Sequence, residues 1–224
     1  YGTECRSCWT VPKGYKLVGI DASGLELRML AHYLNDEGYT NEILNGDIHT
    51  ANQKLAGLES RNQAKTFIYA LLYGAGDEKL GSVAGGGKRT GEKLRKSFFD
   101  NLPSFATLRN KVARTATERS YLKGLDGRKI PIRSEHSALN TLLQGAGAIV
   151  MKQAVVLLND KIKDLDAHFV ANVHDEWQIE VREDLADTVG KLGVEAIIEA
   201  GKVLKLKCPL DGEYKIGDNW SETH

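Results

Sequence analysis

The chain has 224 residues, of which 42% are hydrophobic and 27% charged, and this length is enough for one large domain or two small ones. The composition and a mean hydropathy of −0.34 argue against a disordered, collagen-like or repeat protein. Because no run of about 18 apolar residues is present, we expect no membrane span, and the formal net charge of zero argues against a uniformly basic nucleic-acid binder.

Two cysteines stand near the start of the chain. Cys5 and Cys8 form a Cys-x-x-Cys pair, and Cys208 is the third cysteine. An odd, low number argues against a disulfide scaffold and predicts a reducing compartment, so we expect a cytoplasmic protein. A zinc site would need further ligands at similar spacing, so the pair is interpreted as two unrelated thiols. The sequence begins with Tyr and does not open on the charged-then-apolar pattern of a signal peptide, and we expect it to be a piece of a longer protein.

The first third of the chain is predicted to be one strand followed by helices. Apolar runs, helical periodicity and turn residues give the bounds. We expect a buried strand over 16–21, a helix over 23–33, a polar and turn-rich stretch over 36–47, and helical structure over 49–74 with a break near Gly57.

The middle of the chain is predicted to be helical and is strongly basic. A glycine-rich stretch over 81–91 predicts a mobile link, and helices are expected over 91–100 and 103–120. Residues 88–133 carry 13 basic and 4 acidic side chains, a net charge of +9. This segregation suits a segment that contacts phosphates, and it equally suits a solvated basic helical surface.

The last part of the chain combines short strands with two helices. A turn over 124–128 between short strands, a long helix over 137–163, a hairpin over 169–173 and 177–181, a helix over 184–204 and one or two strands over 206–216 are expected. Residues 159–224 carry 8 basic and 15 acidic side chains, a net charge of −7. A small antiparallel sheet built from both ends of the chain, with a largely helical insertion, predicts an α+β fold.

Two acidic positions could form a metal site. Asp21 ends the first predicted strand, where a carboxylate is rigidly mounted, although an Asp there is more often a cap or turn residue. His174-Asp175-Glu176 lies at the tip of the predicted hairpin, where a plain polar turn is the simpler interpretation. If the two strands are neighbours, the carboxylates converge on one point. They would then suit a pair of Mg2+ ions about 3.5–4 Å apart.

The predicted helix after Gly57 carries a stripe of functional side chains. Arg61, Lys65 and Tyr69 recur every four residues, and a four-residue step on a helix rotates by only about 40°. Two cations and a phenol in line suit a triphosphate with its sugar or base. An amphipathic helix with a solvated basic edge would show the same pattern.

Taken together, these motifs resemble family A (polymerase I-like) DNA polymerases of the T-odd phage branch. Asp21-x-x-Gly-Leu-Glu26-Leu-Arg28 is similar to motif A, Arg61-x-x-x-Lys65-x-x-x-Tyr69-x-x-x-Tyr73-Gly74 to motif B, and Val173-His174-Asp175-Glu176 to motif C. The resemblance implies a small palm sheet with a helical fingers insertion. It places the first palm part at 1–35, the fingers at 36–123 and the second palm part at 124–224.

The resemblance also implies roles for single residues. Two Mg2+ ions would be held by Asp21, the carbonyl of Ala22 and Asp175, with Glu176 beside them in a supporting role. The incoming nucleotide would be contacted by His49, Arg61, Lys65, Tyr69, Glu26 and Tyr73. Of these, Lys65 could also protonate the leaving group, and Glu26 would exclude a ribose 2′-hydroxyl. The DNA near the primer end would be contacted in its minor groove by Arg133, Asn140, Gln144 and His174.

The implied activity is template-directed addition of deoxynucleotides to a primer during viral DNA replication in the host cytoplasm. The implied partners are primer-template DNA, deoxynucleoside triphosphates, and missing polymerase segments or replisome proteins, with no membrane involved. The resemblance leads us to expect that an exonuclease domain and a thumb lie outside this sequence, and we therefore expect weak DNA binding by the isolated chain. Two alternatives are a single-subunit RNA polymerase, which Glu26 argues against, and an inactive fragment that serves as a DNA- or partner-binding module.

Overall fold

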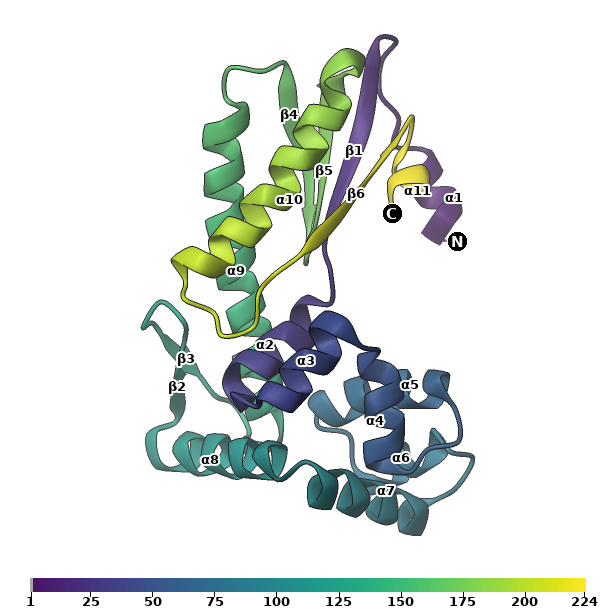
Figure 1. Cartoon of the computed structure of the whole chain (residues 1–224), viewed down its shortest axis with the longest axis vertical. Coiled ribbons are helices and arrows are strands. Elements are labelled where there is room, and N and C mark those ends of the chain that lie inside the picture. Colours follow the sequence, from purple (N-terminus) through teal and green to yellow (C-terminus); the bar gives the residue numbers. More distant parts are fainter. Residues whose placement is uncertain (1) are drawn as a thin grey trace. The chain divides into compact units, whose positions relative to one another are not determined.

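A computed structural model describes residues 2–224 and divides the chain into two compact units, which we treat separately (Figure 1). The sheet unit comprises the residues up to Glu26 together with Gly147–His224. The helical unit is Leu27–Ala146. These borders differ from those that the sequence suggested for palm and fingers, and the assignment of either unit to a palm or a fingers domain stays a prediction.

The sheet unit is built on four antiparallel strands in the order β4-β5-β1-β6. Their bounds are Tyr15–Ala22 for β1, Ala167–Val173 for β4, Glu176–Arg182 for β5 and Gly212–Gly217 for β6. Strands β1 and β5 lie at the centre. The apolar run of β1 has Leu17, Val18 and Ile20 buried, as expected for a strand covered on both faces.

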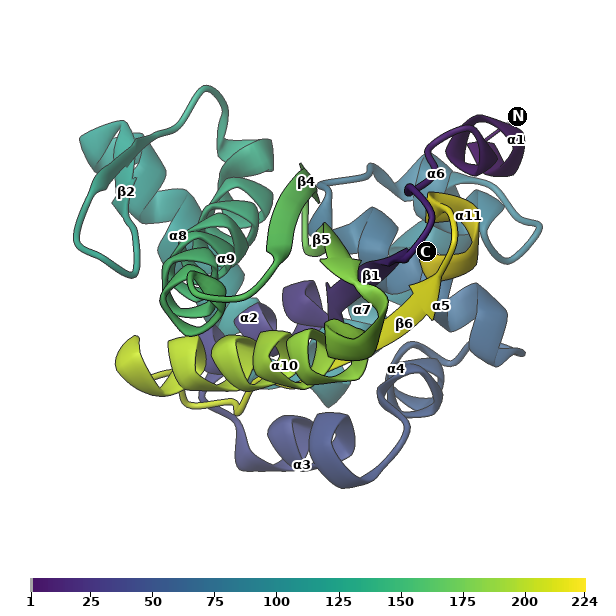
Figure 2. The same cartoon turned by 90° about the horizontal axis from the view of Figure 1, so that it is seen from above.

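Helices cover the two faces of this sheet. Helix α10 (Ala186–Val203) approaches so closely that a Cβ on Gly193 would lie 2.3 Å from Ile20. A Cβ on Gly19 would lie 2.3 Å from the carbonyl oxygen of Thr223 in α11 (Trp220–Thr223). Because neighbouring residues of a strand point to opposite faces, α10 and α11 lie on opposite sides of β1 (Figure 2).

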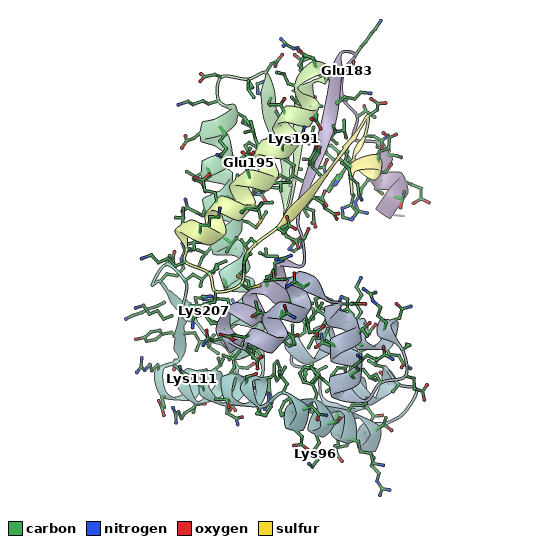
Figure 3. The ribbon with its side chains drawn as sticks, in the orientation of Figure 1. Lys96, Lys111, Glu183, Lys191, Glu195 and Lys207 are labelled. Atoms are coloured by element: carbon green, nitrogen blue, oxygen red, sulfur yellow. The ribbon has the colours of Figure 1, made fainter. Side chains whose placement is uncertain are left out.

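The remaining elements of the sheet unit are short, apart from α9. Helix α1 (Gly2–Ser7) packs against α11, the 3-10 turn η2 (Glu183–Leu185) precedes α10, and α9 (Ala138–Ile162) enters the unit at Gly147. Charged side chains cover the solvent face of α10, where Lys191 and Glu195 project outward (Figure 3). This helix is therefore amphipathic, with its glycines towards the sheet.

The helical unit packs its helices around an aromatic core. The ring of Phe98 lies 5.8 Å from that of Phe67 and 5.3 Å from that of Phe105, both in edge-to-face geometry. The elements of this unit are α2 (Leu25–Leu34, from Leu27 on), α3 (Glu37–Asn45), α4 (Ile48–Ala56), α5 (Arg61–Leu72), α6 (Asp77–Ser82), α7 (Lys88–Asn101), α8 (Pro103–Arg119), β2 (Tyr121–Lys123), β3 (Lys129–Pro131), η1 (Glu135–Ser137) and the start of α9.

The predicted α+β class is confirmed, and two local predictions are wrong. The stretch over 36–47 contains helix α3, whose N-terminus is capped by the Asp36 side chain accepting from the Tyr39 amide at 3.0 Å. The glycine-rich stretch over 81–91 is partly helical, and only 83–87 lie between α6 and α7. Its glycines let α6 and α7 touch, since a Cβ on Gly91 would lie 1.8 Å from the Asp77 carbonyl oxygen. Of the one or two strands expected over 206–216, one forms, β6, which begins at Gly212.

One helical stretch of the described residues is long and apolar enough to cross a bilayer by length and composition alone. It is Glu135–Ile162, with a mean hydropathy of 1.5 over its most apolar window and half of that window buried. A core helix of a globular protein meets the same criterion. This single stretch is therefore weak evidence for a membrane span.

Candidate active site

The two predicted acidic positions come together at the centre of the sheet. Strand β1 ends where β5 begins, and the Cα of Asp21 pairs with the Cα of Glu176. The amide of Ala22 donates to the carbonyl oxygen of Asp175 at 3.0 Å, which ties the end of β1 to the hairpin tip. The end of the strand that carries Asp21 is thus adjacent to the hairpin tip that carries Asp175, which is the arrangement that a shared metal site requires.

The hairpin tip itself is a two-residue link between β4 and β5. His174 is exposed and has a φ of 55°, in the left-handed region that few residues other than glycine adopt. Such backbone conformations cluster at functional sites, where surrounding structure enforces them. The conformation turns the chain so that Asp175, partly exposed, directly precedes the buried start of β5.

Asp21 lies in a strongly negative environment. The pKa of its carboxyl is raised from 3.8 to about 6, first by burial and then by the negative charges of Asp175, Glu176 and Glu213. Asp21, Glu176 and Glu213 also line a cavity of about 220 Å³ within the sheet unit. Carboxylates gathered in this way are stabilised by a cation, so the site fits a divalent metal ion.

The donor set suits Mg2+ better than an all-protein metal cage. Within residues 2–224 no group of three or more His, Cys, Asp or Glu side chains is arranged to hold an ion. Two carboxylates and a backbone carbonyl are what β1 and the hairpin tip offer. Mg2+ commonly binds through one or two carboxylates and takes its other ligands from water and substrate phosphates.

The raised pKa of Asp21 predicts a pH-dependent stability in the absence of divalent ions. Because the folded pKa lies above the unfolded one, the free energy of unfolding should fall as pH rises from about 4 to about 6. Above about pH 6, the free energy of unfolding of Asp21→Asn should exceed that of wild type by about 1 kcal/mol, a figure that allows for solvent screening of this half-exposed group. Urea unfolding of both proteins in EDTA measures this. If the difference in free energy of unfolding between the two proteins did not vary with pH, the raised pKa of Asp21 would be contradicted. Added Mg2+ should abolish this difference at about pH 8.

The predicted cationic stripe is present on α5. Ser60 and Gln63 form a capping box that fixes the start of this helix. Its buried face consists of Ala64, Phe67, Ile68, Leu71 and Leu72. The opposite face therefore presents its polar residues to solvent: Arg61 and Lys65 are exposed and Tyr69 is half-buried.

Helix α4 brings His49 to the same place. The ring centroids of His49 and Tyr69 lie 6.3 Å apart. Burial lowers the pKa of His49, and the positive charges of Arg61 and Lys65 lower it further. The helical unit thus gathers His49, Arg61, Lys65 and Tyr69 into one cationic and aromatic cluster, which suits a phosphate-bearing ligand.

Asp47 joins the two helices of this cluster, and sequence reasoning did not assign it a role. Its carboxylate caps α4 by accepting from the amide of His49 at 3.0 Å, and it also accepts from Arg61 Nε at 2.6 Å. The Arg61 side chain, through its hydrogen bond, holds the pKa of Asp47 well below its usual value. An Asp three residues before Thr50 at the start of a helical pattern is a capping signal, so the sequence did contain a hint.

The other predicted residues are distributed over both units. Tyr73 is the C-terminal cap residue of α5 and is 53% exposed, and Glu26 lies in the first turn of α2. Asn140 and Gln144 stand one turn apart on α9, with Gln144 exposed. The exposed Arg133 lies between β3 and η1 in the helical unit, whereas His174 belongs to the sheet unit.

Comparison with known proteins decides the family. A model of DNA polymerase family A matches residues 1–222. The chain belongs to DNA polymerase family A. This family A member is 44% identical over its whole length to the DNA-directed DNA polymerase of Enterobacteria phage T3 and 43% identical to that of Escherichia phage T7. It spans 37% of the length of each of these relatives, and the predicted kinship with phage enzymes is confirmed.

The fold agrees with a solved family structure. The family A member superposes with a TM-score of 0.89 on the POL domain of Pol1 from M. smegmatis, solved in complex with DNA primer-template and dNTP. The superposition covers 99% of this chain and 43% of that one, at 24% sequence identity. It shows the α+β polymerase fold for the family A member.

Proposed function

We propose that this chain forms the nucleotidyl-transfer part of a template-directed DNA polymerase, which adds deoxynucleotides to a primer 3′-hydroxyl during phage replication in the host cytoplasm. The adjacency of Asp21 and Asp175 across β1 and the hairpin tip is the observation that carries the proposal. The similarity to phage DNA polymerases supports it.

Asp21, Asp175 and the carbonyl of Ala22 would hold two Mg2+ ions at the sheet centre. When bound, these ions would supply Lewis-acid stabilisation of the charge that develops on the reacting oxygens. The protein's own contribution is to mount one carboxylate at the end of β1 and the other on the adjoining hairpin tip, so that the sheet sets their positions before substrate arrives. Because the carboxylates are held close together and partly buried, the pKa of Asp21 is raised when no cation is bound.

The cluster on α4 and α5 would bind the incoming nucleotide. His49, Arg61 and Lys65 would contact the triphosphate, and Lys65 would deliver a proton to the leaving pyrophosphate. Tyr69 would lie under the sugar, Tyr73 near the templating base, and Glu26 where a ribose 2′-hydroxyl would clash. Steric exclusion by Glu26 would favour deoxynucleotides over ribonucleotides.

Primer-template DNA would be contacted by two further sets of residues. Arg133, Asn140, Gln144 and His174 would face the minor groove near the primer end, where acceptors are almost the same for every base pair. The exposed basic residues of α7 and α8 would contact backbone phosphates; they are Lys88, Arg89, Lys93, Lys96, Lys111, Arg114 and Arg119. Figure 3 shows Lys96 and Lys111 on the outer surface of these helices. Polymerase segments or replisome proteins outside this chain would supply further contacts to the DNA.

Charge removal on α7 and α8 should weaken DNA binding without changing its sequence preference. Lys93→Ala and Lys111→Ala together should lower affinity and reduce the slope of log K against log salt by about 2. Fluorescence anisotropy with a labelled primer-template over a range of NaCl concentrations measures this. Lys202→Ala, on α10 of the sheet unit, is the matched control. An unchanged slope in the double variant would show that this surface is only solvated.

The choice of sugar tests the proposal against an RNA polymerase and against an inactive binding module. With Mg2+ and excess primer-template, the chain should incorporate dNTPs at least about 100-fold more efficiently than rNTPs. Glu26→Ala should narrow that ratio by raising ribonucleotide incorporation. Preference for rNTPs would favour the RNA polymerase. Failure to bind a dNTP in the presence of Mg2+ would favour the inactive module.

A further inference from the structure

The carboxylate of Glu176 is enclosed by hydrogen-bond donors. Its side chain is among the few buried charged groups, with 6% of the residue exposed. Gln178 Nε2 donates to Oε1 at 2.5 Å and Trp220 Nε1 donates to the same oxygen at 2.7 Å. The ring Nδ1 of His224 contacts the other oxygen, Oε2. Both oxygens of this carboxylate are therefore engaged within the protein.

The donors are themselves held in place. Thr223 Oγ1 donates to Gln178 Oε1 at 2.7 Å, which fixes the Gln178 amide so that its nitrogen faces Glu176. Lys215 Nζ donates to the carbonyl oxygen of His224 at 3.1 Å. Gly19 lets the segment approach, because any Cβ there would lie 2.7 Å from Gln178 Nε2 and 2.3 Å from the Thr223 carbonyl oxygen. The cluster is thus a closed network between β5 and α11.

The hydrogen-bond network around Glu176 lies directly beside the two proposed metal ligands. A buried carboxylate that lacks donors is strongly destabilising and must move towards solvent or another partner. Glu176 follows Asp175 in the chain, and its Cα pairs with that of Asp21. Any displacement of Glu176 would therefore be passed to both proposed metal ligands. Residues that fix the surroundings of metal ligands commonly alter metal affinity without touching the ion.

We propose that Trp220, Gln178 and His224 are positioning residues that clamp Glu176 within the protein and so hold Asp21 and Asp175 in register for the cations. The inference rests on the proposed two-metal function and adds to it a structural role for α11. In this arrangement Glu176 acts through its hydrogen bonds to the protein. Trp220 is the best test residue, because Trp220→Phe removes the Nε1 donor and keeps an aromatic ring.

Binding of Mn2+ alone, followed by electron paramagnetic resonance without DNA or nucleotide, tests the clamp. Trp220→Phe should weaken Mn2+ binding about tenfold, and Thr223→Val, which loosens Gln178, should weaken it about threefold. Where primer extension is measurable, kcat should fall in parallel while the KM for dNTP stays within about twofold. Trp9→Phe, at an indole that is 67% exposed in the same unit, is the matched control and should behave as wild type.

The outcomes distinguish a failure of the clamp on Glu176 from a failure of the proposed metal site. If Asp175→Asn loses Mn2+ while both clamp variants bind it like wild type, the clamp is overturned and the metal site stands. If Asp175→Asn itself binds Mn2+ like wild type, the metal site is overturned and the clamp with it. Circular dichroism reports folding, and should Trp220→Phe unfold, Thr223→Val decides the question.

Discussion

Asp175→Asn should lower the rate of primer extension by about 1,000-fold or more while leaving the chain folded. The amide keeps the size of the side chain but removes the charge that a divalent ion needs. Asp175 is partly exposed at the hairpin tip, and the backbone bond that joins the tip to Ala22 uses its carbonyl group. The substitution therefore leaves the connection between β1 and the tip intact.

A matched control separates the loss of a ligand from a general loss of charge. Asp160→Asn removes one carboxylate from the exposed side of α9 in the same unit and should extend primers like wild type. The sheet unit's negative charge falls equally in both variants, so nonspecific attraction of Mg2+ is matched. Equal activity of wild type and Asp175→Asn would remove the basis for the metal assignment.

The sequence predicted the elements whose signal is local. The β4–β5 hairpin was predicted as an element, but β5 is buried on consecutive residues and not on alternate ones. The apolar run of β1 and the four-residue stripe on α5 each predicted both the element and the face that the structure shows. Their agreement follows from burial, because a periodic apolar pattern has a single way to face a core. The adjacency of β1 and β5 did not follow from periodicity, and it rested on the resemblance of the motifs.

The features that sequence reasoning missed either had a weak apolar pattern or depend on contacts between distant residues. Helix α3 is rich in polar side chains, and of its residues only Tyr39 is buried. Its apolar pattern was therefore weak, and the visible local signal is the Asp36 side chain that caps its N-terminus. The donors that enclose Glu176 come from 44 and 48 residues away for Trp220 and His224. No spacing rule connects such positions, and only the packing of α11 on β1 brings them together.

The second large effect is expected at Lys65. Lys65→Ala should lower kcat by about 1,000-fold, because it removes both a triphosphate contact and the proposed proton donor to the leaving pyrophosphate. Lys65→Arg keeps the charge, but a guanidinium does not release its proton at neutral pH. It should therefore bind dNTP within about threefold of wild type and still lose about 100-fold in kcat.

Two measurements distinguish the roles of Lys65 from simple disruption of α5. Lys54→Ala, an exposed lysine in the last turn of the neighbouring helix α4, is the control and should leave kcat unchanged. The Lys65 charge also lowers the pKa of His49, so NMR titration of that imidazole should give a higher pKa in Lys65→Ala and no such rise in Lys54→Ala. Wild-type turnover in Lys65→Arg would rule out proton donation. An unchanged His49 titration in Lys65→Ala would show that Lys65 lies outside the cluster on α4 and α5. The two roles can therefore fail separately, because kcat depends on the proton that Lys65 gives up, whereas the His49 titration depends only on where its charge lies.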